Sequence, residues 1–364
     1  MCRVCFISGA ISRSGGTERV GSIIANALSK RGYDVFLLSF WNHGKPYYTL
    51  DEKIHVSYLL DPKKEGKLYR TKIYPVLKLH RFLKQNMIDV VIDIDTVLSR
   101  HTAYAIQGTK CKLISWEHFN YWTMMKLREK NRFQAKKLIR KYASALVVLT
   151  NEDLIKHNEV YHFPEGFVQT IPNPCVSHVV ANYHFANHVF LSVGRLESEK
   201  GYDLLLHAWQ QVEHRLPDWH LAIVGIGSEW ENLLSLKQAL HLERVIFTGH
   251  SDNVGEVYSQ ASAYVLSSRY EGFPMVILEA QSYGLPVIAF DCKTGPRDLV
   301  SHEENGYLVD DGNIEQLAEV MIQFTKDQQK AEKMSYNAAE SVKKYDLESI
   351  TDQWEDLIKK VIQQ

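Results

Sequence analysis

One stretch of this chain, SSRYEGFPMVILEAQSYGLP at residues 267–286, constrains its fold more than any other. Apolar residues between 276 and 283 recur at helical spacing, Pro274 suits the first turn of a helix and Gly284 suits its end. The apolar runs AYVLSS before it and PVIAF after it are typical of short buried strands. The unit is therefore strand, loop, helix, strand, which predicts an α/β protein built on a parallel sheet.

Two acidic residues in this unit, Glu271 and Glu279, are candidate ligand-binding groups. Glu271 is expected in the loop at the carboxyl end of the first strand, where open α/β sheets bind ligands. Glu279 follows about one and a half turns into the helix and can reach the same place. Two carboxylates that converge on one pocket can each bind a pair of sugar hydroxyls. The alternative is a loop acid and a helix-surface acid with no shared task, because carboxylates are common at exposed positions.

The surroundings of the two acids favour the shared site. Upstream, residues 193–206 read VGRLESEKGYDLLL, and a TGP turn follows at residues 294–296. The E-x7-E spacing, the G-R-L-x-x-x-K-G run and this turn stand in the order typical of retaining glycosyltransferases of the GT-B fold. Residues 187–312 resemble the donor-binding half of their family 4, or group 1, type. The resemblance implies an α/β protein with two Rossmann-like, parallel-sheet domains that face a central cleft.

The length of 364 residues and the 45% hydrophobic content provide for two domains, each with its own core. Between residues 4 and 150, short apolar runs alternate with helical or loop stretches, which predicts another parallel sheet. We therefore predict an N-terminal, acceptor-binding domain at 1–172, a linker at 173–187 and a C-terminal, donor-binding domain at 188–349. An amphipathic helix at about 350–364 is expected to return to the first domain, as in GT-B enzymes.

The N-terminal domain holds two further candidate groups. Gly15 and Gly16 end the loop after the first strand, where backbone amides and a helix start can cradle a phosphate or sugar. GGTER resembles the family's GG-x-ER loop, and a plain tight turn is the alternative. His118 ends another strand at a place where family members often carry a histidine that faces the donor sugar; a packed ring is the alternative. The neighbouring Glu117 is expected to face the other way.

The resemblance assigns roles to these residues. The catalytic residues that it implies are Glu271, His118, Arg195 and Lys200. The donor-binding residues that it implies are Gly15, Gly16, Gly272, Phe273, Pro274, Met275, Val276 and Glu279. Arg195 and Lys200 would stabilise the charge that develops on the departing nucleotide diphosphate. Glu279 would hold the ribose and Glu271 the donor sugar, and retention in this family is usually explained by front-face attack without a protein nucleophile.

Asp93 and Asp95 form a D-x-D, the metal signature of the other major glycosyltransferase fold. Such a pair can hold a divalent cation on a nucleotide diphosphate through oxygen ligands. Here it closes a strand away from the diphosphate candidates, so we expect strand-end polarity, no metal site and no cofactor besides the nucleotide-sugar co-substrate. Cys2 and Cys5 form a single C-x-x-C, which we interpret as buried thiols rather than a zinc or redox site.

A dinucleotide site is a rival interpretation of the second half. Gly225 and Gly227 follow a strand pattern and precede a helix, with Glu243 downstream, which is a partial dinucleotide-binding fingerprint. Trp230 occupies the place of the third glycine, where the helix must pack closely on the strand. The turn therefore matches the G-x-G-x-E of the family better than a site for NAD.

The 42 Lys and Arg residues balance 43 Asp and Glu residues, so no global charge recruits nucleic acid. Two basic segments lie in the N-terminal domain. One holds Lys126, Arg128, Lys130, Arg132, Lys136, Lys137, Arg140 and Lys141, and the other holds Lys63, Lys64, Lys67, Arg70, Lys72, Lys78, Arg81 and Lys84. They are either solvated helical faces or a peripheral contact with an anionic membrane. Without a long apolar run or a signal-peptide layout, we expect a cytoplasmic protein, with peripheral contact at the inner face of the membrane.

The sequence therefore predicts a retaining glycosyltransferase. It is expected to move a hexose or N-acetylhexosamine from a nucleotide sugar, expected to be a UDP-sugar, to a glycan or polyprenyl-diphosphate-linked acceptor in cell-surface polysaccharide biosynthesis. Two alternatives stay open, because a fold alone does not certify turnover. One is a sugar-nucleotide epimerase or phosphorylase, and the other is a nucleotide-sugar-binding module without turnover.

Overall fold

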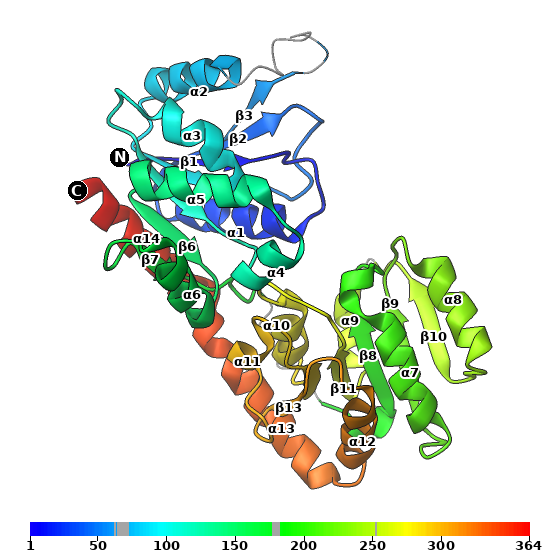
Figure 1. The fold of residues 1–364 in the computed structure, drawn as a ribbon. Helices are drawn as coiled ribbons and strands as arrows, with labels where there is room; N and C mark the ends of the chain where they lie inside the picture. The colour runs from blue at the N-terminus through cyan, green and yellow to red at the C-terminus, as the bar shows by residue number, and fades with distance from the viewer. Residues whose placement is uncertain (62, 64–72, 177–182, 252) are drawn as a thin grey trace. The chain divides into compact units, whose positions relative to one another are not determined.

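The computed structural model describes residues 1–61, 63, 73–176, 183–251 and 253–364 (Figure 1). The chain forms two compact units. Unit 1 comprises Met1–Pro174 and Leu347–Gln364, and unit 2 comprises Cys175–Asp346. The chain leaves unit 1 once and returns to it with its last helix.

Unit 1 is built on a seven-stranded sheet with the order β3-β2-β1-β4-β5-β6-β7, in which all neighbouring strands are parallel. The strands are β1 (Arg3–Ser8), β2 (Asp34–Trp41), β3 (His55–Leu60), β4 (Val90–Asp93), β5 (Lys112–Trp116), β6 (Ala145–Val148) and β7 (Val168–Thr170). The central strands are continuous apolar runs because a parallel sheet is covered on both faces. The strand order reverses between β1 and β4, the kind of place where open α/β sheets bind ligands.

Helices alternate with these strands along the chain. They are α1 (Gly16–Lys30), α2 (Ile73–Gln85), α3 (Ser99–Ala105), α4 (Tyr121–Lys126), α5 (Lys130–Tyr142), α6 (Asn151–Tyr161) and α14 (Leu347–Gln363), with a 3-10 turn at η2 (Thr96–Leu98). The helix α3 packs against both α2 and α5 and lies between them (Figure 1). Buried leucines of α2 and alanines of α3 join the side chains of β1, β2 and β4 in one hydrophobic core.

The last helix, α14, belongs to unit 1 and begins at Leu347, slightly before the predicted start near residue 350. Its apolar stripe is buried, and the ring of Trp354 packs edge to face on Trp116 with centroids 4.6 Å apart. Arg31, at the end of α1, forms ion pairs with three acids on the exposed face of this helix. These ion pairs tie the last helix of the chain, α14, to the end of α1.

Unit 2 has a six-stranded parallel sheet with the order β10-β9-β8-β11-β12-β13. The strands are β8 (Val189–Val193), β9 (His220–Val224), β10 (Val245–Gly249), β11 (Ala263–Leu266), β12 (Val287–Phe290) and β13 (Gly306–Val309). The order reverses between β8 and β11, so the loops after these two strands meet at one edge of the sheet. Both loops carry predicted site residues.

The helices of unit 2 are α7 (Tyr202–Glu213), α8 (Trp230–Ala239), α9 (Val254–Ser259), α10 (Met275–Ser282), α11 (Pro296–Leu299), α12 (Ile314–Phe324) and α13 (Gln328–Ser341). Short 3-10 turns lie at η3 (Phe185–Asn187), η4 (Ser198–Lys200) and η5 (Val342–Tyr345). The strand, loop, helix, strand unit that the sequence predicts is confirmed as β11, α10 and β12. Together with the two parallel sheets, it confirms the predicted α/β class.

The five cysteines are free; Cys2 is half-buried and the other four are buried. Burial raises the pKa of Cys2 to about 11, so its thiol stays protonated at neutral pH. In the described part of the chain, no helix combines the length and the apolar character that crossing a bilayer requires.

Candidate active site

The structure brings together two predicted catalytic residues, Lys200 and Glu271. Lys200 ends the turn η4 after β8, and Glu271 lies in the loop after β11. The Lys200 Nζ donates a hydrogen bond to Glu271 Oε1 at 2.8 Å, and Ser268 Oγ donates to the same oxygen at 2.6 Å. The Glu271 carboxylate is buried with only 8% of its residue surface exposed, whereas the Lys200 side chain is 22% exposed. An ammonium and a carboxylate thus share one place at the carboxyl end of the sheet.

Backbone contacts fix the distance between these two residues. Gly201 has φ +63°, and a Cβ atom there would lie 2.1 Å from the carbonyl oxygen of Ser267, so only glycine fits. Arg269 donates its backbone N–H to the carbonyl oxygen of Glu199 at 2.8 Å and pairs with both oxygens of Asp203. The K-G of the sequence motif therefore has a structural reason: it lets the loop after β8 touch the loop after β11.

The G-I-G turn after β9 packs on the same loop. A Cβ atom at Gly225 would lie 1.8 Å from the carbonyl oxygen of Gly194, and one at Gly227 would lie 2.3 Å from that of Leu196. Leu196 also donates its N–H to the carbonyl oxygen of Ile226 at 3.0 Å. These glycines serve close packing between two loops, which accounts for the partial fingerprint without a dinucleotide.

The TGP turn holds the loop that carries Glu271. Thr294 donates its backbone N–H to the carbonyl oxygen of Glu271 at 3.2 Å, and its hydroxyl donates to that of Gly272 at 3.2 Å. Gly295 has φ +99°, and a Cβ atom there would lie 2.5 Å from Cδ of Pro274. The turn is thus a support for the E-G-F-P loop, a positioning role that its place in the motif did not reveal.

The helix α10 begins directly after this loop. Pro274 is its N-cap and Met275 its first residue, and no described side chain caps this end. The backbone N–H groups of the first turn, with the positive end of the helix dipole, favour an anion here. Gly272 and Phe273 lie in the loop before this helix, and Val276 lies in its first turn.

Glu279 lies further along α10 and is half-buried. Tyr258, from α9, donates its hydroxyl to Glu279 Oε2 at 3.2 Å and stacks on Tyr283 with ring centroids 5.4 Å apart. Tyr258 is itself buried, so its ring holds the hydroxyl in place. Sequence reasoning missed this residue, since Tyr258 lies far from any motif and only the fold brings it to Glu279.

Arg195 is placed differently from the other predicted residues. Its side chain is 74% exposed, and its Nη2 lies 3.2 Å from Oε1 of Glu199 rather than beside Glu271. A long, exposed guanidinium costs little to move, because an exposed ion pair contributes only ~0.2–1 kcal/mol. The structure therefore shows Arg195 near the loop of Lys200 but not in contact with the Lys200–Glu271 pair.

In unit 1, Gly15 is the N-cap of α1 and Gly16 its first residue. Neither glycine has a positive φ. A Cβ atom at Gly16 would meet nothing within 4 Å, whereas one at Gly15 would lie 2.4 Å from Oε2 of Glu18. The space beside Gly16 is thus open. Because Glu18 already places a negative charge in the first turn of α1, this helix start suits a neutral hydroxyl better than a second anion.

Glu117 is buried inside unit 1, and it is the centre of a charged network. Arg132 and Lys136, both from α5, form ion pairs with its carboxylate, the former at 2.8 Å. Thr96 donates its hydroxyl to Oε2 at 2.6 Å, and Phe119 donates its backbone N–H to Oε1 at 3.0 Å. Burial alone would raise the pKa of Glu117, but Lys136 and Arg132 outweigh it and hold that pKa well below its usual range.

His118 lies in the chain between Glu117 and Phe119, and the network around the Glu117 carboxylate holds both of these residues. Its ring packs on Trp116 with centroids 4.6 Å apart, and Arg132 lies over the ring of Phe119 at 3.9 Å. Burial lowers the pKa of His118 to about 3, so the imidazole is neutral at physiological pH. Its Nε2 is buried and has no hydrogen-bond partner among the described residues.

The D-x-D carboxylates are both occupied by protein groups. Asp93 accepts hydrogen bonds from the hydroxyls of Ser99 and Thr102, each at 2.7 Å, and burial raises its pKa to about 7. Asp95 caps the turn η2 and pairs with the guanidinium of Arg132 through both oxygens. Within the described residues, no group of three or more potential ligands is arranged to hold a metal ion.

The structure corrects the view of the first basic segment as one surface. Arg132 and Lys136 are buried, with 5% and 0% of their surface exposed, because they neutralise Glu117 in the interior. In the second segment, Lys64, Lys67, Arg70 and Lys72 lie outside the described residues. Of the eight cations in the first segment, Arg132 and Lys136 are therefore not available to a partner at the surface.

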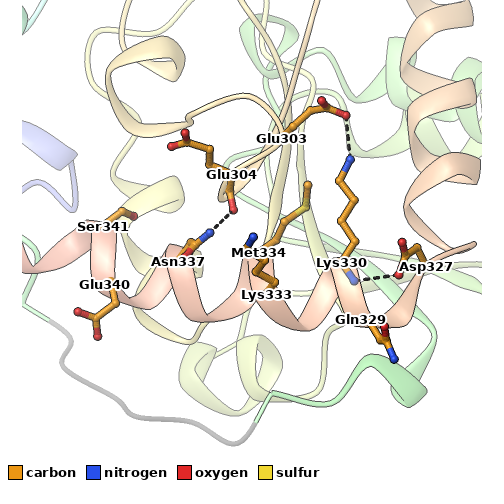
Figure 2. Close-up of a pocket in the computed structure, with 10 residues that line it drawn as sticks. All are labelled: Glu303, Glu304, Asp327, Gln329, Lys330, Lys333, Met334, Asn337, Glu340 and Ser341. Atoms are coloured by element: carbon orange, nitrogen blue, oxygen red, sulfur yellow. Dashed lines mark hydrogen bonds and ion pairs between the residues drawn. The ribbon is translucent and has the colours of Figure 1, made fainter.

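A hollow of about 950 Å³ lies beside α13 in unit 2 (Figure 2). Lys330 pairs with Glu303 at 2.8 Å across it, and Asn337 donates to the carbonyl oxygen of Glu304 at 2.8 Å. None of the predicted site residues lines this hollow. It is a polar surface recess that the site does not use.

Two family models match the two halves of the chain. The model described as Glycosyltransferase Family 4 matches residues 14–176, and the model described as Glycosyl transferases group 1 matches residues 186–341. A glycosyltransferase of Haemophilus influenzae is 33% identical over 98% of this chain and 100% of its own length. The chain therefore belongs to the group 1 glycosyltransferases, and it is an enzyme of that class.

Two further relatives carry more specific names. The amylovoran biosynthesis glycosyltransferase AmsD of Erwinia amylovora is 31% identical over 98% of this chain and 100% of its own length. A Campylobacter jejuni N-acetylgalactosaminyltransferase that acts on a diphospho-undecaprenol-linked trisaccharide is 27% identical over 99% of both chains.

A solved structure confirms the fold. The structure of HepE of Anabaena in complex with UDP-glucose superposes with a TM-score of 0.80 at 19% identity, and it covers 99% of this chain and 100% of its own. The two Rossmann-like units are thus those of a GT-B glycosyltransferase.

Proposed function

We propose that this glycosyltransferase moves a hexose or N-acetylhexosamine from a UDP-sugar, with retention, to a glycan or a polyprenyl-diphosphate-linked acceptor. The observation that carries the proposal is the Lys200–Glu271 pair, 2.8 Å apart, beside the uncapped start of α10. A cation and a helix N-terminus suit a diphosphate, and a buried carboxylate beside them suits a sugar hydroxyl. UDP in the HepE complex and the polysaccharide roles named for the relatives support the donor and the pathway class.

The roles within unit 2 follow from these positions. Lys200 and the amides of Gly272 and Phe273 stabilise the departing diphosphate, and Arg195 swings onto it from its exposed position. Glu279, oriented by Tyr258, accepts hydrogen bonds from the ribose hydroxyls.

Glu271 is suited to positioning rather than to nucleophilic attack. Its Oε1 already accepts hydrogen bonds from Lys200 and Ser268, which lowers its reactivity as a nucleophile. In the proposed step, the acceptor oxygen forms a bond to the anomeric carbon on the face from which the phosphate oxygen departs. That phosphate oxygen takes the proton of the acceptor hydroxyl, so UDP leaves and the anomeric configuration of the donor is kept.

Under the same proposal, two features of unit 1 act on the donor sugar and acceptor. His118 offers a neutral Nε2 without a described partner, which can accept or donate a hydrogen bond to a sugar hydroxyl. The open space beside Gly16 leaves room for a sugar.

We also propose that the reaction needs no metal, since Lys200 supplies the cation. Activity should then survive treatment with EDTA. Loss of activity in EDTA that Mn²⁺ restores would contradict this.

Product analysis tests the proposal. The full chain is incubated with radiolabelled UDP-sugars and with lipid extracts or soluble glycans as acceptors. Transfer of label with release of UDP is expected. An isomerised nucleotide sugar would instead indicate an epimerase, and tight binding without turnover would indicate a binding module; either result contradicts the proposed transfer.

A further inference from the structure

An apolar groove of about 510 Å³ opens on unit 1 between α2, α3 and α5. Leu77 of α2, Tyr104 of α3 and Leu138 of α5 each contribute to its lining. Figure 1 shows the three helices next to one another, with α3 between the other two. The groove therefore lies along one helical layer of this unit.

Large apolar side chains at this groove are exposed and do not contribute to the hydrophobic core. Ile73 is 70% exposed, Leu77 62% and Tyr104 47%. The helix α2 already supplies Leu79 and Leu83 to the core, so Ile73 and Leu77, one turn apart, form a second apolar stripe. A contiguous exposed apolar patch of this kind marks an interaction site.

The three helices that line the groove carry charged residues of a single sign. The helices α2, α3 and α5 contain no acidic residue. Their exposed cations are Arg81, Lys84, Lys130, Lys137, Arg140 and Lys141. The groove itself holds His101, whose pKa is lowered to about 4 by burial and by Arg100, so this imidazole is neutral at physiological pH.

We propose that this surface docks unit 1 on a lipid bilayer that contains acidic phospholipid. The apolar stripe enters the boundary between headgroups and acyl chains, and the lysines and arginines of α2 and α5 pair with lipid phosphates. Helices that carry cations and no acids beside exposed aliphatic side chains fit a laterally uniform anionic layer, whereas a specific protein interface usually pairs charges of both signs. The docking goes beyond the proposed transfer and does not depend on the donor site in unit 2.

Vesicle co-sedimentation of the full chain tests this surface. At low salt, the wild type is expected to sediment with vesicles that contain phosphatidylglycerol and to stay in solution with phosphatidylcholine alone. Added salt should release it, because exposed charges are screened. If the wild type ignores acidic vesicles at low salt, the proposal is overturned, and an acidic protein becomes the better occupant.

The cations are tested with Lys137→Glu and Lys141→Glu together. Both residues are exposed on α5, one turn apart, so the fold should tolerate the change. The loss of two cations alone should weaken vesicle binding about 30-fold, and reversal should weaken it further. The matched control carries Lys53→Glu and Lys360→Glu, two exposed lysines elsewhere in unit 1 with the same change in net charge. Equal binding by both variants contradicts the surface.

The apolar stripe is tested with Ile73→Ser and Leu77→Ser. This variant should lose the part of vesicle binding that persists as salt is raised, while Ile155→Ser with Ile362→Ser, also exposed in unit 1, should keep it. Wild-type behaviour of the first variant overturns the groove as the docking element. All variants should still bind UDP in a thermal-shift assay, so a failure here leaves the glycosyl-transfer proposal to its own test.

Discussion

Lys200 and Glu271, 71 residues apart in the chain, are joined by a hydrogen bond of 2.8 Å across the loops that follow β8 and β11. The pair is held by backbone geometry on both sides, since Gly201 touches Ser267 and the TGP turn supports Glu271. We therefore expect the two residues to act as a unit, so that the effects of their substitutions on activity are not additive.

Removal of the Lys200 ammonium should lower the turnover rate strongly and the free energy of unfolding little. With Lys200→Met, we expect the rate to fall on the order of a hundredfold, because the departing diphosphate loses a fixed cation. The double variant Lys200→Met with Glu271→Gln should fall less than the product of the two single losses. Steady-state kinetics of the four proteins measure the coupling, and strict additivity would show that the pair is not a functional unit.

Glu279 should determine nucleotide affinity. Glu279→Ala removes a charged acceptor of ribose hydroxyl hydrogen bonds, each worth about 1.5–3 kcal/mol, so the Kd for UDP should rise at least tenfold. Tyr258→Phe should weaken binding less, since it removes only the hydroxyl that orients the carboxylate. Calorimetric titration with UDP measures both; the exposed Glu256→Ala on α9 is the control, and an unchanged affinity in Glu279→Ala would remove the ribose assignment.

Gly201→Ala should damage the site through the backbone. A Cβ atom there would collide with the carbonyl oxygen of Ser267, in addition to the strain of a positive φ. Gly312→Ala is the matched control, because its φ is +74° but its surroundings are open. Thermal melts should show a larger loss of Tm for Gly201→Ala, with activity lost alongside; equal Tm values would argue against the close contact.

The free energy of unfolding should depend on pH through two half-buried histidines. The pKa values of His118 and His101 are lowered to about 3 and about 4, against 6.5 for the free side chain. Below pH 6.5 the unfolded chain takes up protons that the folded chain refuses, so stability is complete above that pH and is lost as the pH falls. Each histidine can contribute up to about 1.4 kcal/mol per pH unit. Asp93, whose pKa burial raises to about 7, contributes a slope of opposite sign over the same range, so the histidine contribution is measured as a difference. In urea unfolding between pH 7 and 5, the free energy of unfolding of His101→Gln should fall less with acid than that of the wild type.

The sequence predicted the α/β class and the strand, loop, helix, strand unit because both depend on local periodicity. It could not predict Tyr258, which only the folding of α9 against α10 brings to Glu279. Nor did the count of basic residues reveal that Arg132 and Lys136 are interior. Helical phase carried that signal: with Ala135 and Ile139 they fall at positions i, i+3, i+4 and i+7, the buried face of α5.

From the sequence we expected Glu117 to lie on a strand and to face away from His118. In the structure the strand β5 ends at Trp116, and Glu117 begins the loop that follows. Its buried carboxylate holds this loop, because a buried carboxylate must find cations and hydrogen-bond donors. Pairs between residues this far apart in the sequence do not recur at a fixed spacing, so no sequence pattern predicts them.

We propose that the Lys200–Glu271 site carries out retaining transfer from a UDP-sugar. Its most direct test is proton NMR of the product formed by the wild type, compared with that of Glu271→Gln. We expect the new linkage to keep the anomeric configuration of the donor, with UDP released in equal amount, and Glu271→Gln to form the same linkage far more slowly. An inverted linkage, or full activity in Glu271→Gln, would contradict it.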